Sequence, residues 1–210
     1  MRPIEVGEWP GAIGVIHRAL FDQPFARQTY GDGAVTRWGR SYDDYAGVRR
    51  EHYSLALGAF AGPVVVGVVL ASLPDACQAC KGPSPTARLD DPIDALNWQF
   101  DRDRAAVHRA QPAHAWISKL TVEPALQGLG IGRALLDAVT AQLPTSLPVL
   151  LECEMHRERF YAARGFRRVT TVPDPTGPDV LLLRLAAVNP ERESVRRPGP
   201  RPSSRALDSP

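Results

Sequence analysis

The stretch that decides the fold is Leu120-Thr-Val-Glu-Pro-Ala-Leu-Gln127-Gly-Leu-Gly-Ile-Gly132-Arg-Ala-Leu-Leu136. A β-prone run ends in a loop with three glycines, and an amphipathic helix follows at once. Glycines let backbone N–H groups turn toward one point and let a ligand approach without a Cβ in the way. Because the positive end of the helix dipole lies beyond the same loop, the segment predicts an anion site suited to a pyrophosphate.

Other glycine-rich loops do not match this segment. No Lys-Ser or Lys-Thr pair follows the glycines, which excludes a P-loop. The dinucleotide pattern G-x-G-x-x-G fails in both registers, because Arg133 or Leu135 occupies the position of the third glycine. The remaining alternative is an ordinary strand–loop–helix turn without a ligand.

Hydrophobic periodicity and turn residues predict both helices and strands, as in an α/β fold. Helices are expected at residues 10–20, 41–52, 92–109, 132–143 and 157–164, and strands at 54–60, 63–72, 115–122, 149–154, 167–172 and 180–185. Residues 25–40 and 73–91 are expected to be irregular. One domain spans residues 1–186, with 73–110 as an insertion before the strand at 115–122. Residues 187–210, rich in Pro, Arg and Ser, are expected to form a disordered tail.

Composition excludes several functional classes. The 210 residues carry a formal net charge of +2, too near balance for a nucleic-acid-binding face. The most apolar stretch, residues 63–73, is far shorter than the roughly 20 residues of a membrane helix. No leader segment is expected at the N-terminus. Three cysteines are too few for a disulfide framework, so a reducing, cytoplasmic location is expected.

Two motifs resemble those of one family. Gln127-x-x-Gly130-x-Gly132 is similar to the Q/R-x-x-G-x-G/A acyl-CoA loop of the GNAT acetyltransferase superfamily. Leu151-Glu152 and Phe160-Tyr161-x-x-x-Gly165-Phe166 resemble its downstream L-E…F-Y-x-x-x-G-F segment. The helix inserted before Ala115 and this downstream segment are most similar to the puromycin N-acetyltransferase subgroup.

The resemblance implies an acetyl-CoA-dependent N-acetyltransferase that acts on the primary amine of a small molecule, such as an antibiotic or another amine metabolite. Transfer would be direct, in a ternary complex, with acetyl-CoA as co-substrate. The same resemblance implies a mixed, mostly antiparallel sheet flanked by helices, with the cleft opening between the splayed strands at residues 120–122 and 149–154. Two alternatives stay open: a protein or peptide acceptor, and a non-catalytic acyl-CoA-binding module. A homodimer is also left open.

Residue roles follow from the same resemblance. Tyr161 matches the tyrosine that protonates the departing CoA thiolate; its alternative is a tyrosine packed in the core. Arg157 stands where an Asn often contacts pantetheine. The positions that would bind the co-substrate are Leu120, Thr121, Val122, Gln127, Gly128, Leu129, Gly130, Ile131, Gly132, Arg133, Arg157 and Phe160.

The general base is the least determined part of the site. Trp116 occupies the position at which some family members keep an acidic residue. Strand alternation is expected to put His114, Trp116 and Ser118 on one face, toward the acceptor. His114, Ser118 and Glu152 are therefore the candidates for taking the amine proton. Each also has a plainer interpretation, as a surface histidine, a polar strand residue or an ion-paired glutamate.

Two further groups of residues have competing interpretations. Cys77-x-x-Cys80 looks like half a zinc site, but neither a second CxxC nor a closely spaced histidine pair follows. No metal is therefore expected. Phe21, Phe25, Tyr30 and Trp38 lie where family members build the acceptor pocket, and ordinary core packing explains them equally well.

Overall fold

The computed structural model describes residues 1–30, 33–83, 92–175 and 178–187. Within these residues seven strands form one sheet in the order β1-β2-β3-β4-β5-β7-β6. Neighbouring strands are antiparallel except for the parallel pair β4 and β5, which confirms the predicted mixed sheet. The strands are β1 (Arg2–Pro3), β2 (Leu55–Ala61), β3 (Val64–Ser72), β4 (Ala115–Val122), β5 (Val149–Glu154), β6 (Arg167–Val172) and β7 (Val180–Leu185).

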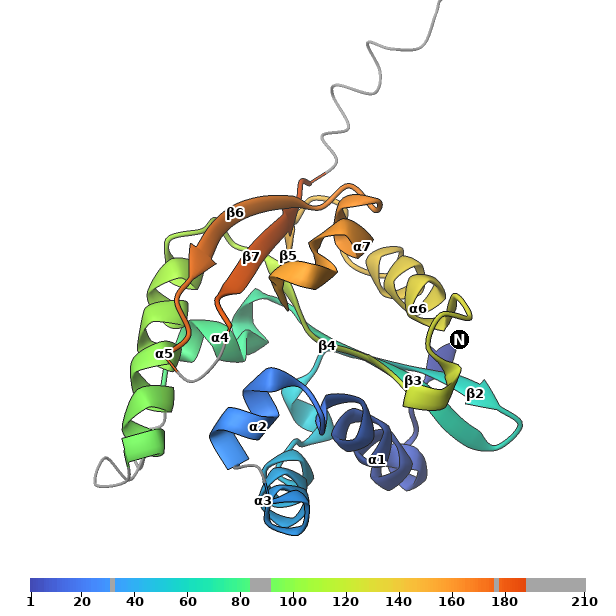
Figure 1. The fold of residues 1–210 in the computed structure, drawn as a ribbon. Helices are drawn as coiled ribbons and strands as arrows, with labels where there is room; N and C mark the ends of the chain where they lie inside the picture. The colour runs from blue at the N-terminus through green and yellow to red at the C-terminus, as the bar shows by residue number, and fades with distance from the viewer. Residues whose placement is uncertain (31–32, 84–91, 176–177, 188–210) are drawn as a thin grey trace, which may run out of the picture.

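Helices cover both faces of this sheet (Figure 1). One face carries α1 (Trp9–Leu20), α2 (Pro24–Tyr30) and α3 (Ala34–Ala46), and the other carries α6 (Ile131–Thr140) and α7 (Glu158–Ala162). The short α4 (Gln78–Lys81) packs against α5 (Pro92–Arg109), which runs beside the β6–β7 end of the sheet. Short 3-10 turns occur at Val6–Glu8, Arg50–His52, Pro74–Ala76, Pro124–Leu126 and Met155–Arg157. No helix in the described ranges is long and apolar enough to cross a membrane.

A glycine controls how closely α6 approaches the sheet. Leu135 and Leu136 of α6 are fully buried in the core on this face. A Cβ at Gly67 of β3 would lie 2.9 Å from Leu135 Cδ1 and 3.1 Å from Ile131 Cγ2. Both distances are shorter than ordinary van der Waals contact, so a larger residue at position 67 would have to displace the Leu135 and Ile131 side chains or the helix.

The irregular segment expected at residues 25–40 is wrong, because α2 and α3 occupy most of it. Pro24 suits the first turn of α2, where its missing N–H costs nothing. Ser41, expected to start a helix, lies inside α3, where its buried Oγ is 2.8 Å from His17 Nε2. Packing of α3 against α1 therefore overrides the helix-breaking tendency of Gly39 within α3.

The other predicted elements agree closely with the structure. α5 has the expected bounds, and both hairpins are present, with Gly62 in a left-handed turn at φ 59°. Gly165 follows α7 with φ 87°, as expected for the residue after a last turn. The loop expected at residues 73–91 contains a 3-10 turn and α4, and its residues 84–91 lie outside the described ranges. The same holds for the predicted tail after residue 187.

Two substitutions in α3 are expected to have opposite effects on stability. Ser41→Ala leaves the buried His17 ring without that hydroxyl and should lower the free energy of unfolding by about 1–2 kcal/mol. Gly39→Ala should raise it by up to about 1 kcal/mol, because an added Cβ there meets no atom within 4 Å and alanine favours helix. Urea denaturation measures both values. Equal effects of the two variants would contradict this account of α3.

Candidate active site

β4 and β5 pair over only three positions, residues 115–117 with residues 149–151. Beyond them β4 stays paired with β3, and β5 stays paired with β7. Within the described ranges no strand fills the space between β4 and β5 past these positions. The backbone N–H and C=O groups on that edge of residues 120–122 are therefore available to a ligand lying between the strands.

The glycine loop follows β4 directly. Gly128 and Gly130 have φ of 81° and 83°, in the left-handed region that side chains disfavour. A Cβ at either position would meet no protein atom within 4 Å, so the surface over the loop is open. Gly130 is also the N-cap of α6, and no side chain caps this helix end. The first N–H groups of α6 are thus left for a bound anion.

Gln127 has a different role from the glycines. Its side-chain amide donates to Val122 O at 3.2 Å, and its backbone N–H donates to Pro124 O at 3.3 Å. The side-chain bond holds the start of the loop against the end of β4, and the backbone bond closes the 3-10 turn before the loop. Gln127 therefore shapes the loop, and the donors available to an anion come from the residues after it.

Two exposed apolar side chains lie next to the glycine loop. The Phe160 ring is 40% exposed, and an added Cβ at Gly132 would lie 3.8 Å from it and 3.6 Å from Val122 Cγ2. Leu129, at the tip of the loop, is 70% exposed. Phe160 and Leu129 thus expose apolar surface next to the glycine loop, which a pantetheine chain could cover.

Tyr161 lies beneath Phe160 at the edge of the core. Its ring packs edge-on against Phe160, with centroids 4.9 Å apart, and against Phe166 at 5.9 Å. Burial raises the pKa of the Tyr161 phenol, so the group keeps its proton at neutral pH. The ring is thus fixed by packing, as the core interpretation expects, and the protonated hydroxyl is retained, as a proton donor requires.

A β-bulge in β4 changes which side chains share a face. Leu70 of β3 faces Lys119, whereas the next residue, Ala71, faces Ile117, so Ser118 is the extra residue. Simple alternation therefore fails at this point, and Trp116 is followed on its face by Lys119 and Thr121. The Ser118 hydroxyl lies 3.5 Å from Leu70 O and within hydrogen-bonding reach of Tyr53.

Charged side chains gather on the face that carries Trp116. Arg104 of α5 lies 2.8 Å from Asp101 and 3.5 Å from Glu152 of β5. Lys119 belongs to the same group. Its pKa is lowered mainly by burial and, to a lesser extent, by the positive charge of Arg104. The sequence interpretation missed this network. Its signal was the polar stripe Asp101, Arg104 and His108 at helical spacing on α5.

Glu152, a candidate base, is held by two partners. His108 Nε2 lies 2.8 Å from Glu152 Oε1, and Arg104 lies on the other oxygen. Burial raises the pKa of Glu152, but Arg104 and the hydrogen bond from His108 outweigh burial, so the net shift is downward. An ionised carboxylate with a lowered pKa is a weak proton acceptor.

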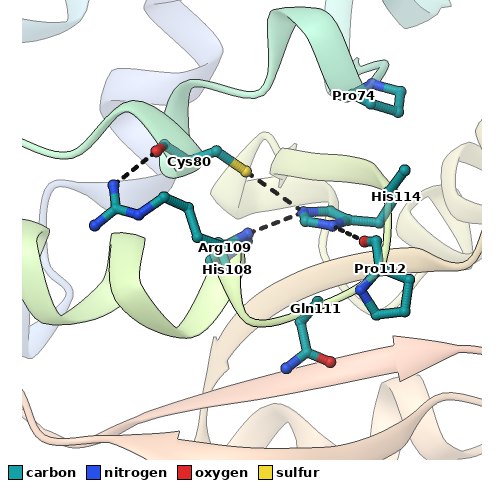
Figure 2. Close-up of a pocket in the computed structure, with 8 residues that line it drawn as sticks. Pro74, Cys80, His108, Arg109, Gln111, Pro112 and His114 are labelled. Atoms are coloured by element: carbon teal, nitrogen blue, oxygen red, sulfur yellow. Dashed lines mark hydrogen bonds between the residues drawn. The ribbon is translucent and has the colours of Figure 1, made fainter.

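His114, the second candidate, is buried at the start of β4, where it lies beside Cys77 and Cys80. Figure 2 shows its ring between Cys80, His108 and Pro112. Its Nδ1 lies 2.8 Å from Pro112 O, and its Nε2 lies 3.2 Å from His108 Nδ1 and 3.8 Å from the sulfurs of Cys77 and Cys80. Both ring nitrogens thus have partners away from the gap between β4 and β5. Ser118 is the one base candidate that lies at the bulge beside this gap.

Aromatic side chains of α1 and α3 form a half-open surface on the face opposite α6. Phe21 and Trp38 pack edge-to-face with centroids 5.2 Å apart, and His17 lies 4.1 Å from Trp38. Trp38 and Tyr42 remain 46% and 47% exposed. Tyr30 is buried in the core, and the side chain of Phe25 lies outside the described residues.

The central part of this site matches a known protein-family model. Residues 96–168, which include β4, the glycine loop, α6, β5 and Tyr161, match the family model of the acetyltransferase (GNAT) domain. No curated protein sequence matches the chain. The motifs that resembled the GNAT loop and the downstream segment both lie inside the matched region.

Solved structures share the fold at low identity. A histone acetyltransferase HPA2-related acetyltransferase from Corynebacterium glutamicum superposes with a TM-score of 0.64 at 16% identity, over 90% of this chain and 96% of its own. A polyamine N-acetyltransferase of Drosophila melanogaster gives a TM-score of 0.55 at 16% identity, over 88% and 97% of the two chains. The ribosomal-protein-S18-alanine N-acetyltransferase of Escherichia coli gives 0.53 at 16%, over 89% and 92%. These likenesses establish the GNAT fold.

Proposed function

We propose that this chain, which carries a GNAT acetyltransferase domain, transfers the acetyl group of acetyl-CoA to the primary amine of a small molecule. The observation that carries the proposal is one arrangement. The open glycine loop and the gap between β4 and β5 meet at the carboxyl end of β4, and Tyr161 belongs to the core cluster that also holds Val122. An acyl thioester needs these three elements: an anion site, a slot for an extended chain, and a proton donor.

The co-substrate would lie along this arrangement. Its pyrophosphate would accept hydrogen bonds from backbone N–H groups of residues 128–133, each worth about 1.5–3 kcal/mol when charge-assisted. Its pantetheine would pair with the free edge of residues 120–122 and lie against Phe160. The thioester would then reach the bulge at Ser118, near the point where β4 and β5 separate.

The reaction is a direct transfer. The neutral amine attacks the thioester carbonyl, the new C–N bond forms, and the C–S bond breaks with its electron pair on sulfur. Tyr161 gives its proton to that sulfur and is reprotonated from solvent. The amine proton leaves through a water held by Ser118 and Tyr53, because Glu152 is ion-paired and His114 faces the cysteines.

A small acceptor fits the aromatic surface of α1 and α3. Exposed rings such as Trp38 favour an amine with an apolar or aromatic body, and they stabilise a cation through the ring face. Aminonucleosides of the puromycin kind belong to this class. A cytoplasmic location would supply acetyl-CoA and keep Cys77, Cys80 and Cys153 as free thiols.

Thiol release from acetyl-CoA in the presence of an acceptor panel tests the proposal. The panel should contain aminonucleosides, aminoglycosides, polyamines, and peptides with a free N-terminus or an internal lysine. We expect turnover with one or more small amines at a kcat/KM at least about a hundredfold above that of any peptide. Preference for a peptide would transfer the function to protein acetylation. Tight acetyl-CoA binding without turnover on any acceptor would indicate a non-catalytic module.

A further inference from the structure

Two pairs of side chains, far from each other in the sequence, converge at the start of β4. Cys77 and Cys80 come from the segment after β3, His108 from the last turn of α5, and His114 from the residue before β4. Their ligand atoms all lie within 4.8 Å of one another. We propose that Cys77, Cys80, His108 and His114 bind one zinc ion in a structural site that is independent of the acetyl transfer.

The hydrogen bonds of the two histidines point to a cation between them. A carbonyl oxygen can only accept, so His114 Nδ1 donates its proton to Pro112 O at 2.8 Å. The Glu152 carboxylate likewise accepts from His108 Nε2 at 2.8 Å. In neutral rings the remaining nitrogens, His114 Nε2 and His108 Nδ1, therefore carry lone pairs, yet they lie only 3.2 Å apart. Two lone pairs this close repel unless a proton or a metal ion lies between them.

The distances fit a small tetrahedron. Zinc bonds of about 2.3 Å to sulfur and about 2.05 Å to nitrogen place ligands about 3.4 Å apart for two nitrogens and about 3.6 Å apart for nitrogen and sulfur. The structure has 3.2 Å between the nitrogens and 3.8 Å from His114 Nε2 to each sulfur. The two sulfurs, 2.9 Å apart, must separate by about 0.9 Å to share the ion. Small side-chain rotations of Cys77 or Cys80 achieve this.

The surroundings are those of a supported metal site. Ligating histidines commonly donate their second N–H to a carboxylate or a backbone carbonyl. Here His108 donates to the Glu152 carboxylate, and His114 donates to the carbonyl of Pro112. Glu152 is held in turn by Arg104, and the Arg109 side chain donates to Cys80 O at 3.0 Å. A cavity of about 150 Å³ opens beside Cys80, His108 and His114 and gives an ion access from solvent (Figure 2).

The ligand set favours zinc in a closed, structural role. Two thiolates and two imidazoles in a tetrahedron suit zinc better than harder cations, which prefer oxygen. Four protein ligands leave no position for a substrate or an activated water. The ion would join the segment after β3, the end of α5 and the start of β4. The no-metal expectation overlooked a signal in the sequence, because His108-x5-His114 after Cys77-x2-Cys80 has the spacing of a zinc-ligand pair. The fold brings this pair to the cysteines from the two sides of the α5–β4 turn.

A metal-free alternative exists in the same atoms. Burial raises the pKa of the Cys77 thiol, but hydrogen bonds with His108 and His114 outweigh burial and lower it to about 5. Without metal, the cluster would then hold a Cys77 thiolate beside a protonated His108. That pair would be open to alkylation, or Cys77 and Cys80 could oxidise to a disulfide. Zinc binding protects both sulfurs from each reaction.

Metal content of the purified full-length chain tests the proposal. Elemental analysis should find about one zinc per chain in the unmodified protein and in Cys153→Ala, which removes the third cysteine away from the cluster. The double variant C77S/C80S should carry less than about a tenth of that amount. Zinc in the double variant equal to that in the controls would overturn the site.

Metal titration keeps the test decisive if the double variant does not fold. The unmodified protein, stripped by a chelator and reduced, should melt at a lower temperature and regain its stability with one equivalent of zinc. Cobalt should give the visible absorption of a tetrahedral thiolate site. Glu152→Gln, which retains all four ligands, should weaken zinc affinity by about 10–100-fold. A reduced protein that binds neither metal and whose Cys77 is alkylated at once would establish the thiolate–imidazolium pair and refute the proposal.

Discussion

Tyr161→Phe is expected to lower kcat by about 10- to 1,000-fold while KM for acetyl-CoA changes by less than about threefold. The ring keeps its contacts with Phe160 and Phe166, so packing and co-substrate binding are preserved. Only the proton donor is lost, and the CoA thiolate must then leave unaided or take a proton from water. Steady-state thiol release measures both constants.

Three measurements separate this role from a structural one. Thermal melting and an acetyl-CoA titration should be nearly the same for Tyr161→Phe and the unmodified protein. The fall in kcat at high pH should be smaller in the variant, because the unmodified protein loses its proton donor there and the variant has none to lose. Burial raises the pKa of the Tyr161 phenol, so this fall begins only at high pH. An unchanged kcat in a folded variant would make Tyr161 a core residue and nothing more.

Gly130→Asp is expected to weaken acetyl-CoA binding at least tenfold more than Gly130→Asn, a difference of about 1.4 kcal/mol. Asn and Asp have nearly the same shape, and both tolerate the left-handed backbone better than other side chains do. The φ of 83° at this position therefore strains the two variants alike. Only the negative charge at the start of α6 differs, and it repels a pyrophosphate bound there.

Isothermal titration of the two variants at low and high salt completes this test. The gap between Asp and Asn should narrow as salt rises, because an exposed charge is screened. Equal affinities at low salt, in variants with matching circular dichroism spectra, would show that the anion lies elsewhere.

Local sequence patterns predicted most of the fold. The bounds of α5, the two hairpins and the strand–loop–helix at residues 115–140 follow from periodicity, caps and glycines, which act over a few residues. α2 was missed, and the helix predicted at residues 41–52 lies instead at Ala34–Ala46, because α1 stabilises α3 through contacts such as the one between Ser41 and His17. No short pattern encodes such contacts.

The base candidates were harder to place for a related reason. Alternation along β4 fails at Ser118 because one residue is inserted there, and nothing in the strand itself marks the bulge. His114 and Glu152 belong to the two strands expected to form the cleft or lie next to them. In the structure, however, both are within hydrogen-bonding distance of His108 on α5. The partners that decide their chemistry come from a segment that the sequence interpretation treated as an insertion.

Gly67 carries a consequence for how such chains diverge. It lies under the first turns of α6 and sets how closely Ile131 and Leu135 pack on β3. A homologue with alanine at this position should carry a smaller residue at 131 or 135, so that the two exchanges occur together. Alanine at position 67 alone would crowd these two side chains, and a smaller residue at 131 or 135 alone would leave a gap beside Gly67. Covariation between Gly67 and Leu135 would then show that selection preserves the position of α6, and with it the anion site at the start of this helix, although neither residue contacts the ligand.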